Sequence, residues 1–430
     1  MMGRRAGVAR NITTTYVARL ASILTLFVLF PAVARVVPAS EYGVYLLTAG
    51  MASLFSVDLG MAGSATRYVS EAHVLGDDSR MRSVLAGSAV FFVGVGIFSS
   101  GALVVTIVFG WKDFHFTPEQ ASIGLVAGAA AVAQVALGSI AANERAILTG
   151  LGRIDLANWI LIAQAFTRFG ATLVVLGVSR EIIWVAVVDA SAAVIGTFLF
   201  VIIRRMVLRT RFEFGRDFNW AVLRHMWGLS RDMLVMSLAA TVILYAGGVV
   251  VGLTSSAVSV ALFAAGQRIY QAAKEIPNSL TAPLLPIATA NHLDGAGRNK
   301  WLYLDGTRFS LALVLASLPP VCVYMATLVE WWLGPNYSVA ADVAMLLTAS
   351  VILNCLHLVA VPVMGGQESL GWYSVLHGMW AVSALGLGFL FSSEFGAVGM
   401  ALAVALPLVI LEPLYVGRAL RKTGGLGSSS

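Results

Sequence analysis

The densest group of side chains that could bind a ligand lies in residues 258–286. Amide and ammonium groups recur there at spacings of four, three and four residues, which place them on one face of an α-helix. These residues are Gln267, Gln271, Lys274 and Asn278. Arg268 and Glu275 stand beside this polar stripe, seven residues apart. A water-filled cavity or an internal salt-bridge network would satisfy such a face, and we favour the cavity.

Four further charged residues interrupt long apolar segments, at Arg19, Asp58, Arg168 and Asp189. Charge is costly inside hydrocarbon, so each is a candidate functional residue. Structural explanations also exist: Arg19 could extend to the membrane interface, and Asp58, in the middle of its segment, could hydrogen-bond a neighbouring helix. A buried carboxylate can hold a proton near neutral pH, which makes Asp58 and Asp189 the candidates for ion coupling.

Motifs for catalysis are missing from the sequence. It contains no P-loop, no HExxH metal motif and no nucleophile elbow. Cys322 and Cys355 are far apart and offer no metal-ligand spacing. Asn354 and His357 lie one helical turn apart; a membrane histidine can shuttle protons, but we interpret this one as a hydrogen-bonded packing residue. We therefore expect no enzyme activity, no cofactor and no metal site.

The composition indicates which elements must position these residues. Apolar residues make up 58% of the chain and charged residues 12%, and the mean hydropathy is +0.84. Soluble domains carry about 25% charged residues, so a soluble enzyme and a disordered scaffold are both excluded. Apolar runs of about 20 residues, the length that crosses a bilayer, predict an all-α polytopic membrane protein with about twelve transmembrane helices. The predicted spans are 13–37, 43–68, 83–110, 118–142, 156–178, 182–203, 228–252, 258–286, 307–329, 339–363, 372–392 and 396–417.

The distribution of Lys and Arg predicts the orientation. With twelve spans, nearly all basic residues outside the helices fall on one side, which leaves Arg35, Lys112 and Arg180 on the other. The positive-inside rule then places both termini in the cytoplasm. Arg19 within the first span argues against a cleavable signal peptide, so we expect this helix to be retained.

One long interruption divides the chain into two halves. Residues 206–226 carry arginines interleaved with aromatic residues, which we interpret as a connector on the anionic membrane surface rather than a nucleic-acid site. The predicted domains are a six-helix bundle over 1–205, this connector, a second six-helix bundle over 227–420 and a flexible tail over 421–430. Even numbers of spans give both halves the same orientation, so an axis along the membrane normal would relate them.

Several short motifs, spread in order along nearly the whole chain, resemble those of a known family. The motifs are Glu41–Tyr45, Val57–Gly60, Ala65–Glu71, Ile147–Arg153, Leu333–Tyr337 and Phe395–Ala401. Together they resemble the polysaccharide (O-antigen type) flippase family of the multidrug/oligosaccharidyl-lipid/polysaccharide exporter superfamily. That family exports lipid-linked O-antigen and related repeat units.

The resemblance implies two six-helix bundles around a central cavity that is lined by the first, second, seventh and eighth helices. It implies alternating access driven by an ion gradient, with H⁺ or Na⁺ as the coupling cation, which we assign to Asp58 or Asp189. It also implies that intramembrane cations contact the pyrophosphate of the substrate. The candidate substrate-binding residues are Arg19, Gln267, Arg268, Gln271, Lys274 and Asn278 on lining helices, and Arg168 on the fifth helix.

The sequence thus predicts a flippase that moves polyprenyl-pyrophosphate-linked oligosaccharide repeat units across the bacterial inner membrane. Its expected partners are this substrate, membrane lipids and other polysaccharide-assembly proteins, with no nucleic acid. A drug/cation antiporter of the same superfamily is the first alternative, disfavoured because a cavity rich in Arg and Lys repels cationic drugs. A membrane polysaccharide polymerase or ligase is the second, disfavoured because every outer loop is short for such an enzyme.

Overall fold

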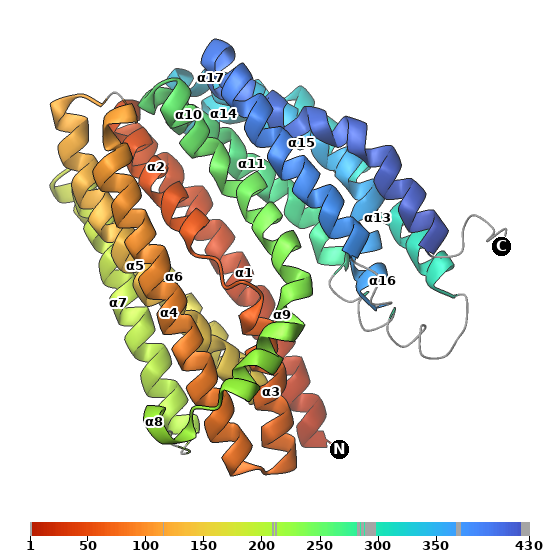
Figure 1. Cartoon of the computed structure of the whole chain (residues 1–430). Helices are drawn as coiled ribbons and strands as arrows, with labels where there is room; N and C mark the ends of the chain where they lie inside the picture. The colour runs from red at the N-terminus through yellow and green to blue at the C-terminus, as the bar shows by residue number, and fades with distance from the viewer. Residues whose placement is uncertain are drawn as a thin grey trace. The chain divides into compact units, whose positions relative to one another are not determined.

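The computed structural model describes residues 2–114, 116–208, 210, 213–281, 284, 288, 298–366 and 371–422. Within these residues every regular element is a helix, and Figure 1 shows their order along the chain. The helices group into two compact units, Met1–Leu238 and Ala239–Ser430. This division falls inside one helix, downstream of the expected connector, and the domain boundaries expected from the sequence stay a prediction.

The first unit is built around one long central helix, α5. Its helices are α1 (Met2–Val36), α2 (Ala39–Phe55), α3 (Met61–Leu75), α4 (Asp78–Gly110), η1 (Trp111–Phe114), α5 (Pro118–Gly150), α6 (Ile154–Val178), α7 (Ile182–Val207), α8 (Phe214–Asp217) and α9 (Trp220–Thr241). α5 packs against α2, α3, α4 and α7, while α1 packs against α6. Gly124 and Gly128 of α5 face Trp111 and Ile107 so closely that a Cβ atom at either glycine would collide with its neighbour. Small residues therefore allow the close packing around α5.

Capping side chains fix the starts of α4 and α5. Thr117 and Gln120 form a capping box before α5, in which each side chain accepts a hydrogen bond from the backbone amide of the other, at 3.3 and 3.1 Å. α4 begins behind Asp77, whose Oδ1 accepts hydrogen bonds from the amides of Arg80 and Ser79 at 2.9 and 3.0 Å. These bonds, above all the one from Arg80, lower the pKa of Asp77 because they stabilise its carboxylate.

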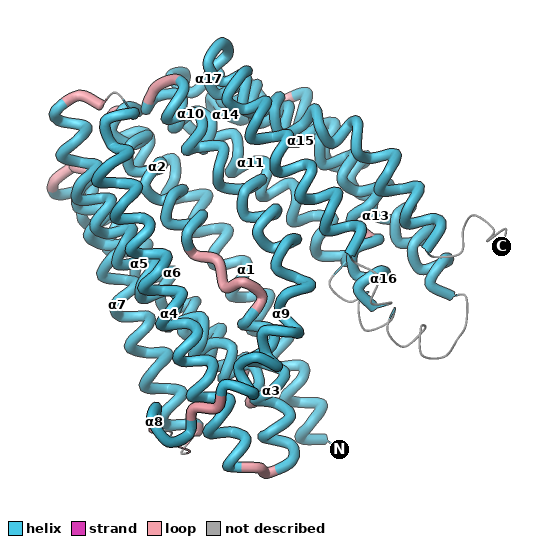
Figure 2. The backbone as a smooth tube through the Cα atoms, viewed as in Figure 1, coloured by secondary structure: helices cyan, strands magenta, loops and turns pink. Residues whose placement is uncertain are grey.

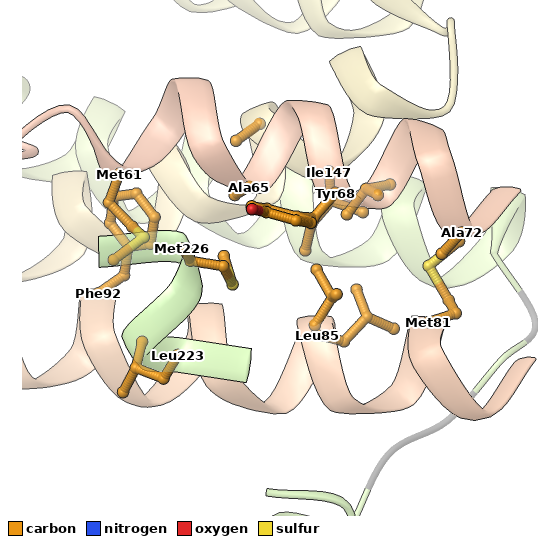
Figure 3. Close-up of a cluster of buried hydrophobic side chains, with 13 residues drawn as sticks. Met61, Ala65, Tyr68, Ala72, Met81, Leu85, Phe92, Ile147, Leu223 and Met226 are labelled. Carbon is orange, nitrogen blue, oxygen red and sulfur yellow. The ribbon is translucent and has the colours of Figure 1, made fainter. Parts of the chain in front are cut away.

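The connector expected on the membrane surface also contributes to the core of the first unit. It contains the short helix α8 and the first turns of α9. Figure 3 shows Leu223 and Met226 of α9 among apolar side chains of α3 and α4, including Tyr68, Leu85 and Phe92. Part of the apolar content of the connector therefore anchors it to this unit by burial.

The second unit is built around α15. Its elements, after the end of α9, are η2 (Val242–Ala246), α10 (Gly247–Thr254), α11 (Ala257–Thr281), α13 (Arg298–Val323), α14 (Met325–Leu333), η3 (Pro335–Tyr337), α15 (Ser338–Leu358), α16 (Ala360–Gly366) and α17 (Gly371–Lys422). α15 packs against α11, α13, α14 and α17. Gly396, with a φ of 55°, divides α17 into two helical arms, 371–395 and 397–422. The indole of Trp380 in the first arm donates to the carbonyl of Val404 in the second at 2.8 Å.

Nine helices in the described part of the chain are long and apolar enough to cross a membrane. α17 counts once among them although its two arms match two predicted spans. The predicted second span, 43–68, is split into α2 and α3, and α11 in the eighth, 258–286, is too polar to count. α11 ends at Thr281, and most of the remainder of that span lies outside the described residues. These three differences explain why nine helices are counted where twelve spans are predicted. The all-α, multi-pass membrane fold is confirmed.

Candidate functional site

The predicted second span is broken where Asp58 lies. α2 ends at Phe55 and α3 begins at Met61, and Leu59 and Gly60 between them have φ values of 53° and 77°. Figure 2 shows this segment as a loop between two helices. The expectation that Asp58 sits in the middle of a helix is therefore wrong. Its Oδ1 accepts a hydrogen bond from the Gly60 amide at 3.1 Å, a local bond that competes with the helical ladder.

A small cavity opens beside this break. It has a volume of about 100 Å³, and its polar lining comes from Asp58 and the hydroxyls of Ser56, Ser99 and Ser139. Broken membrane helices commonly place such oxygen atoms around a coupling ion. No group of three or more His, Cys, Asp or Glu side chains that could hold a metal occurs within the described ranges. Carboxylate and hydroxyl oxygens are donors that hard cations prefer, and ion coupling at Asp58 stays a prediction.

Arg168 and Asp189, expected in different roles, form one hydrogen-bonded pair. Nε and Nη2 of Arg168 donate to Oδ1 and Oδ2 of Asp189 at 2.5 and 2.9 Å, a bidentate geometry. The hydroxyl of Tyr45 donates to the same carboxylate and accepts from Arg168 Nη2, the latter at 3.3 Å. These side chains join α6, α7 and α2, and Asp189 and Tyr45 are buried. These contacts hold Arg168 and Asp189 together as a structural pair, so either residue would have to leave the pair to bind substrate or a coupling ion.

Arg19 lies on an exposed face of α1. Thr15, one turn earlier, accepts a hydrogen bond from the side chain of Asn158 in α6 at 2.9 Å. Ser22, three residues after Arg19, donates to the carbonyl of Ala18 at 2.9 Å. The polar residues around Arg19 are thus tied to α1 and α6, and the contact of Arg19 with substrate stays a prediction.

The polar stripe of α11 begins with a hydrogen bond inside the second unit. The amide of Gln267 donates to the backbone carbonyl of Leu244. Leu244 lies in η2, a π-helical turn, where the regular i→i+4 ladder is interrupted. Such turns are frequent at functional sites. Gln267 therefore helps to hold the π-helical turn against α11.

The remaining residues of the stripe are half-buried. Arg268 Nη1 donates to Gln271 Oε1 at 3.1 Å, and the ammonium of Lys274 lies 5.9 Å from the centroid of the Tyr270 ring. Asn278 follows one turn later, near the end of α11. α11 thus carries two cations, Lys274 in the stripe and Arg268 beside it. The exposure of the stripe to a cavity between the two halves stays a prediction.

One buried ion pair in the first unit, Glu144–Arg204, is not among the residues predicted from the sequence. Arg204 Nε contacts Glu144 Oε2 at 2.5 Å, with the two side chains 10% and 8% exposed. The predicted span 182–203 stops just before Arg204, whereas α7 continues to Val207 and carries this residue into the unit. The spans expected from hydropathy end too early because polar residues at helix ends lower the local average.

A second missed pair lies in the second unit. His357 Nδ1 is 2.6 Å from Glu412 Oε2, and the two side chains are 1% and 5% exposed. The His357 ring stacks on Tyr415 with centroids 4.2 Å apart, and the Tyr415 hydroxyl bonds Nδ1 of His377 at 2.8 Å. His357 is thus a hydrogen-bonded residue with an acidic partner. Glu412 is the sole charged residue in the predicted span 396–417, and that was the signal by which it could be found.

Comparisons with known proteins bear on both fold and family. Residues 8–292 match a family model described as "Polysaccharide biosynthesis protein". An inward-facing multidrug resistance MATE family transporter of the MOP superfamily is similar at 12% identity and a TM-score of 0.77, over 96% of this chain and 99% of that chain. Lipid II flippase MurJ in an inward closed conformation is similar at 13% identity and a TM-score of 0.74, over 96% of this chain and 87% of that chain. No curated protein sequence matches significantly.

The family match and the structural matches agree. The matched residues, 8–292, make up well over half of the chain and include the motifs at 41–45, 57–60, 65–71 and 147–153. The structural matches, at such low identity, show the fold alone, and that fold is one of transporters and flippases. The chain belongs to the polysaccharide biosynthesis protein family and has the fold of the multidrug/oligosaccharidyl-lipid/polysaccharide exporter superfamily.

Proposed function

We propose that the protein is a flippase that moves polyprenyl-pyrophosphate-linked oligosaccharide repeat units, such as those of O-antigen, across the bacterial cytoplasmic membrane by alternating access. The observation that carries the proposal is that α11 carries Lys274 in its polar stripe and Arg268 beside the stripe, in a chain of this family. Sugar hydroxyls and a pyrophosphate cannot cross hydrocarbon unsatisfied, since each buried polar group costs several kcal/mol. The polar stripe and the cations on α11 would replace water around such a headgroup.

The proposed roles follow from the chemistry of each group. Arg19, Arg268 and Lys274 would bind the pyrophosphate, the arginines as bidentate donors and the lysine as a point charge. The amides Gln267, Gln271 and Asn278 would hydrogen-bond the headgroup. Arg168 would join them only by exchanging Asp189 for a phosphate.

Coupling to H⁺ or Na⁺ is proposed at Asp58, where the helix break and the adjacent cavity support it, or at Asp189 after release of Arg168. Both termini are proposed to lie in the cytoplasm, from the distribution of basic residues. Membrane lipids and other polysaccharide-assembly proteins are the proposed partners.

The test is the rate at which lipid-linked repeat units cross the membrane of proteoliposomes. A charge-assisted hydrogen bond contributes about 1.5–3 kcal/mol, so Arg268→Ala and Lys274→Ala should each slow transport about 10- to 100-fold. Arg308→Ala is the matched control, because that side chain is 73% exposed. Undiminished transport by both α11 variants, at normal protein abundance, would contradict pyrophosphate binding by the stripe.

A drug/cation antiporter is the second candidate, supported by the similarity to the MATE transporter. The cations of the stripe disfavour cationic drugs by repulsion. Transport of cationic dyes by the same proteoliposomes, with no transport of lipid-linked sugar, would favour the antiporter.

A further inference from the structure

A cluster of buried titratable side chains lies in the second unit, away from the residues assigned to substrate or to coupling. His357 comes from the end of α15 and Glu412 from the second arm of α17. Glu412 Oε2 bonds His357, whereas Glu412 Oε1 is buried with no hydrogen-bond partner among the described residues. An ionised carboxylate offers about four acceptor sites, and leaving them unfilled in a dry interior is costly. The pair is therefore better satisfied when it holds a proton.

Aromatic side chains enclose this pair. Tyr415 stacks on the His357 ring, and Tyr373 in the first arm donates its hydroxyl to the His357 carbonyl at 3.4 Å. Tyr373, Tyr415 and Trp380 are fully buried. Such a wall keeps the local dielectric low, so that a change of one charge acts strongly on nearby groups.

Titratable and charged groups on several helices lie near the pair. The charge of Lys274 in α11 acts on both His357 and His377. The Tyr303 hydroxyl of α13 donates to the carbonyl of Leu356 at 3.0 Å. Arg418, one turn beyond Tyr415, lies 5.8 Å from the Trp372 ring. The titratable groups around the pair are thus Lys274, Tyr303, Cys355, Tyr373, His377 and Tyr415.

Charge counting shows what one proton does here. With His357 neutral and Glu412 ionised, the pair carries a charge of −1, opposite in sign to the ammonium of Lys274, whose charge acts on His357. With one more proton shared between them, the pair is neutral and no longer offsets any of the charge of Lys274. An anion near Lys274 is bound more strongly in the second state than in the first.

We infer that His357 and Glu412 form a proton-binding site whose occupancy sets the charge presented to Lys274, and so couples proton binding to the binding of an anionic phosphate headgroup at α11. The headgroup rests on the proposed function, but the proton site does not. Because the two sites are linked, an anion at Lys274 strengthens proton binding at the pair by the same factor by which the proton strengthens anion binding.

The first experiment tests the proton site without any substrate. Infrared difference spectra of the full-length protein in lipid nanodiscs, recorded as a function of pH, report protonated carboxyl groups. Wild type should show a carboxyl band that is missing in Glu412→Gln and that titrates at a different pH in His357→Gln. Glu394→Gln, the same change at an exposed position of α17, is the control and should keep the band. Identical pH-dependent spectra of wild type and Glu412→Gln would overturn the inference.

The second experiment tests the coupling with inorganic pyrophosphate as the probe. In weakly buffered solution, its addition should cause proton uptake by wild type that is lost in Glu412→Gln and in Lys274→Gln. Equal uptake by all three proteins would overturn the coupling. Failure to transport lipid-linked sugar would count against the proposed function and leave the infrared result standing, so the two failures are distinguishable.

Discussion

Each unit holds a buried pair of polar side chains that joins two of its helices. In the first unit Glu144 of α5 meets Arg204 of α7, and in the second His357 of α15 meets Glu412 of the second arm of α17. α5 and α15 are the central helices of their units, and each is the fourth predicted span of its half. Both pairs lie toward the C-terminal ends of these central helices. Each pair thus joins the helices of the fourth and sixth predicted spans of its half.

The two pairs differ in whether their charge can change. Arginine does not lose its proton in proteins, so Arg204 keeps its charge and the Glu144–Arg204 pair fixes α5 to α7. Histidine can lose its proton, so His357–Glu412 can exist in two charge states. One unit thus carries a fixed clamp and the other a titratable pair. The first three of the four predictions that follow test this difference or the turn beside it, and the fourth tests a helix cap outside both pairs.

The largest effect is expected at the fixed pair. Glu144→Gln should lower the free energy of unfolding by about 3–5 kcal/mol, because it leaves the Arg204 guanidinium buried without its counter-ion. Unfolding in mixed detergent micelles gives the measurement. The double variant Glu144→Met with Arg204→Met should regain most of this loss, since an apolar pair of similar volume needs no counter-ion. A loss below 1 kcal/mol in Glu144→Gln would mean that the pair is not a clamp.

A smaller effect is expected at the turn that positions Glu412. Gly396→Ala places a Cβ in a backbone conformation with a φ of 55°, which costs about 1–3 kcal/mol. The Cβ itself meets only ordinary contacts, 3.4 Å from Ser255 Oγ and Ser259 Oγ, so the loss would come from the backbone. Gly386→Ala in the same helix is the control, as its Cβ meets nothing within 4 Å. Equal stability of the two variants in the same unfolding assay would contradict this account of the turn.

The titratable pair should respond less to the same substitution than the fixed pair. Glu412→Gln should lower the free energy of unfolding by about 0.5–1.5 kcal/mol, the range of one neutral hydrogen bond, because a neutral His357 leaves no charge unpaired. Its unfolding is measured beside that of Glu144→Gln under identical conditions. A loss as large as that of Glu144→Gln would show that His357 is permanently charged, and the contrast between the units would disappear.

The smallest effect is expected at Asp77, outside both pairs. The pKa of Asp77 is lowered in the folded protein, so its carboxylate stabilises the start of α4 at pH values above the ordinary Asp pKa. This contribution is lost as the pH falls through the lower pKa of the folded state. Hydrogen exchange of the Ser79 and Arg80 amides, corrected for intrinsic rates, should therefore accelerate below about pH 4. Asp77→Asn should abolish this acid dependence. An unchanged pH profile in that variant would assign the response to another group.

Hydropathy and charge along the chain determined the membrane class, the number of spans and the polar stripe. These are local properties: an apolar run of sufficient length must cross the bilayer, and the spacing of Gln271, Lys274 and Asn278 fixes their common helical face. The predicted start of α5 at Pro118 also holds, because Thr117 and Gln120 cap it locally. The family motifs are also local, because each is a short segment whose residues are adjacent in the sequence.

Only the tertiary structure decided which intramembrane charges meet. Arg168 and Asp189 are 21 residues apart, and Glu144 and Arg204 are 60 apart. His357 and Glu412 are 55 apart. Such pairs depend on how packed helices rotate and slide against one another, and the period of a single helix carries no information about its partner's register. The break at Asp58 is decided in the same way, since the hydropathy of 43–68 is that of one span while its backbone turns at Leu59 and Gly60.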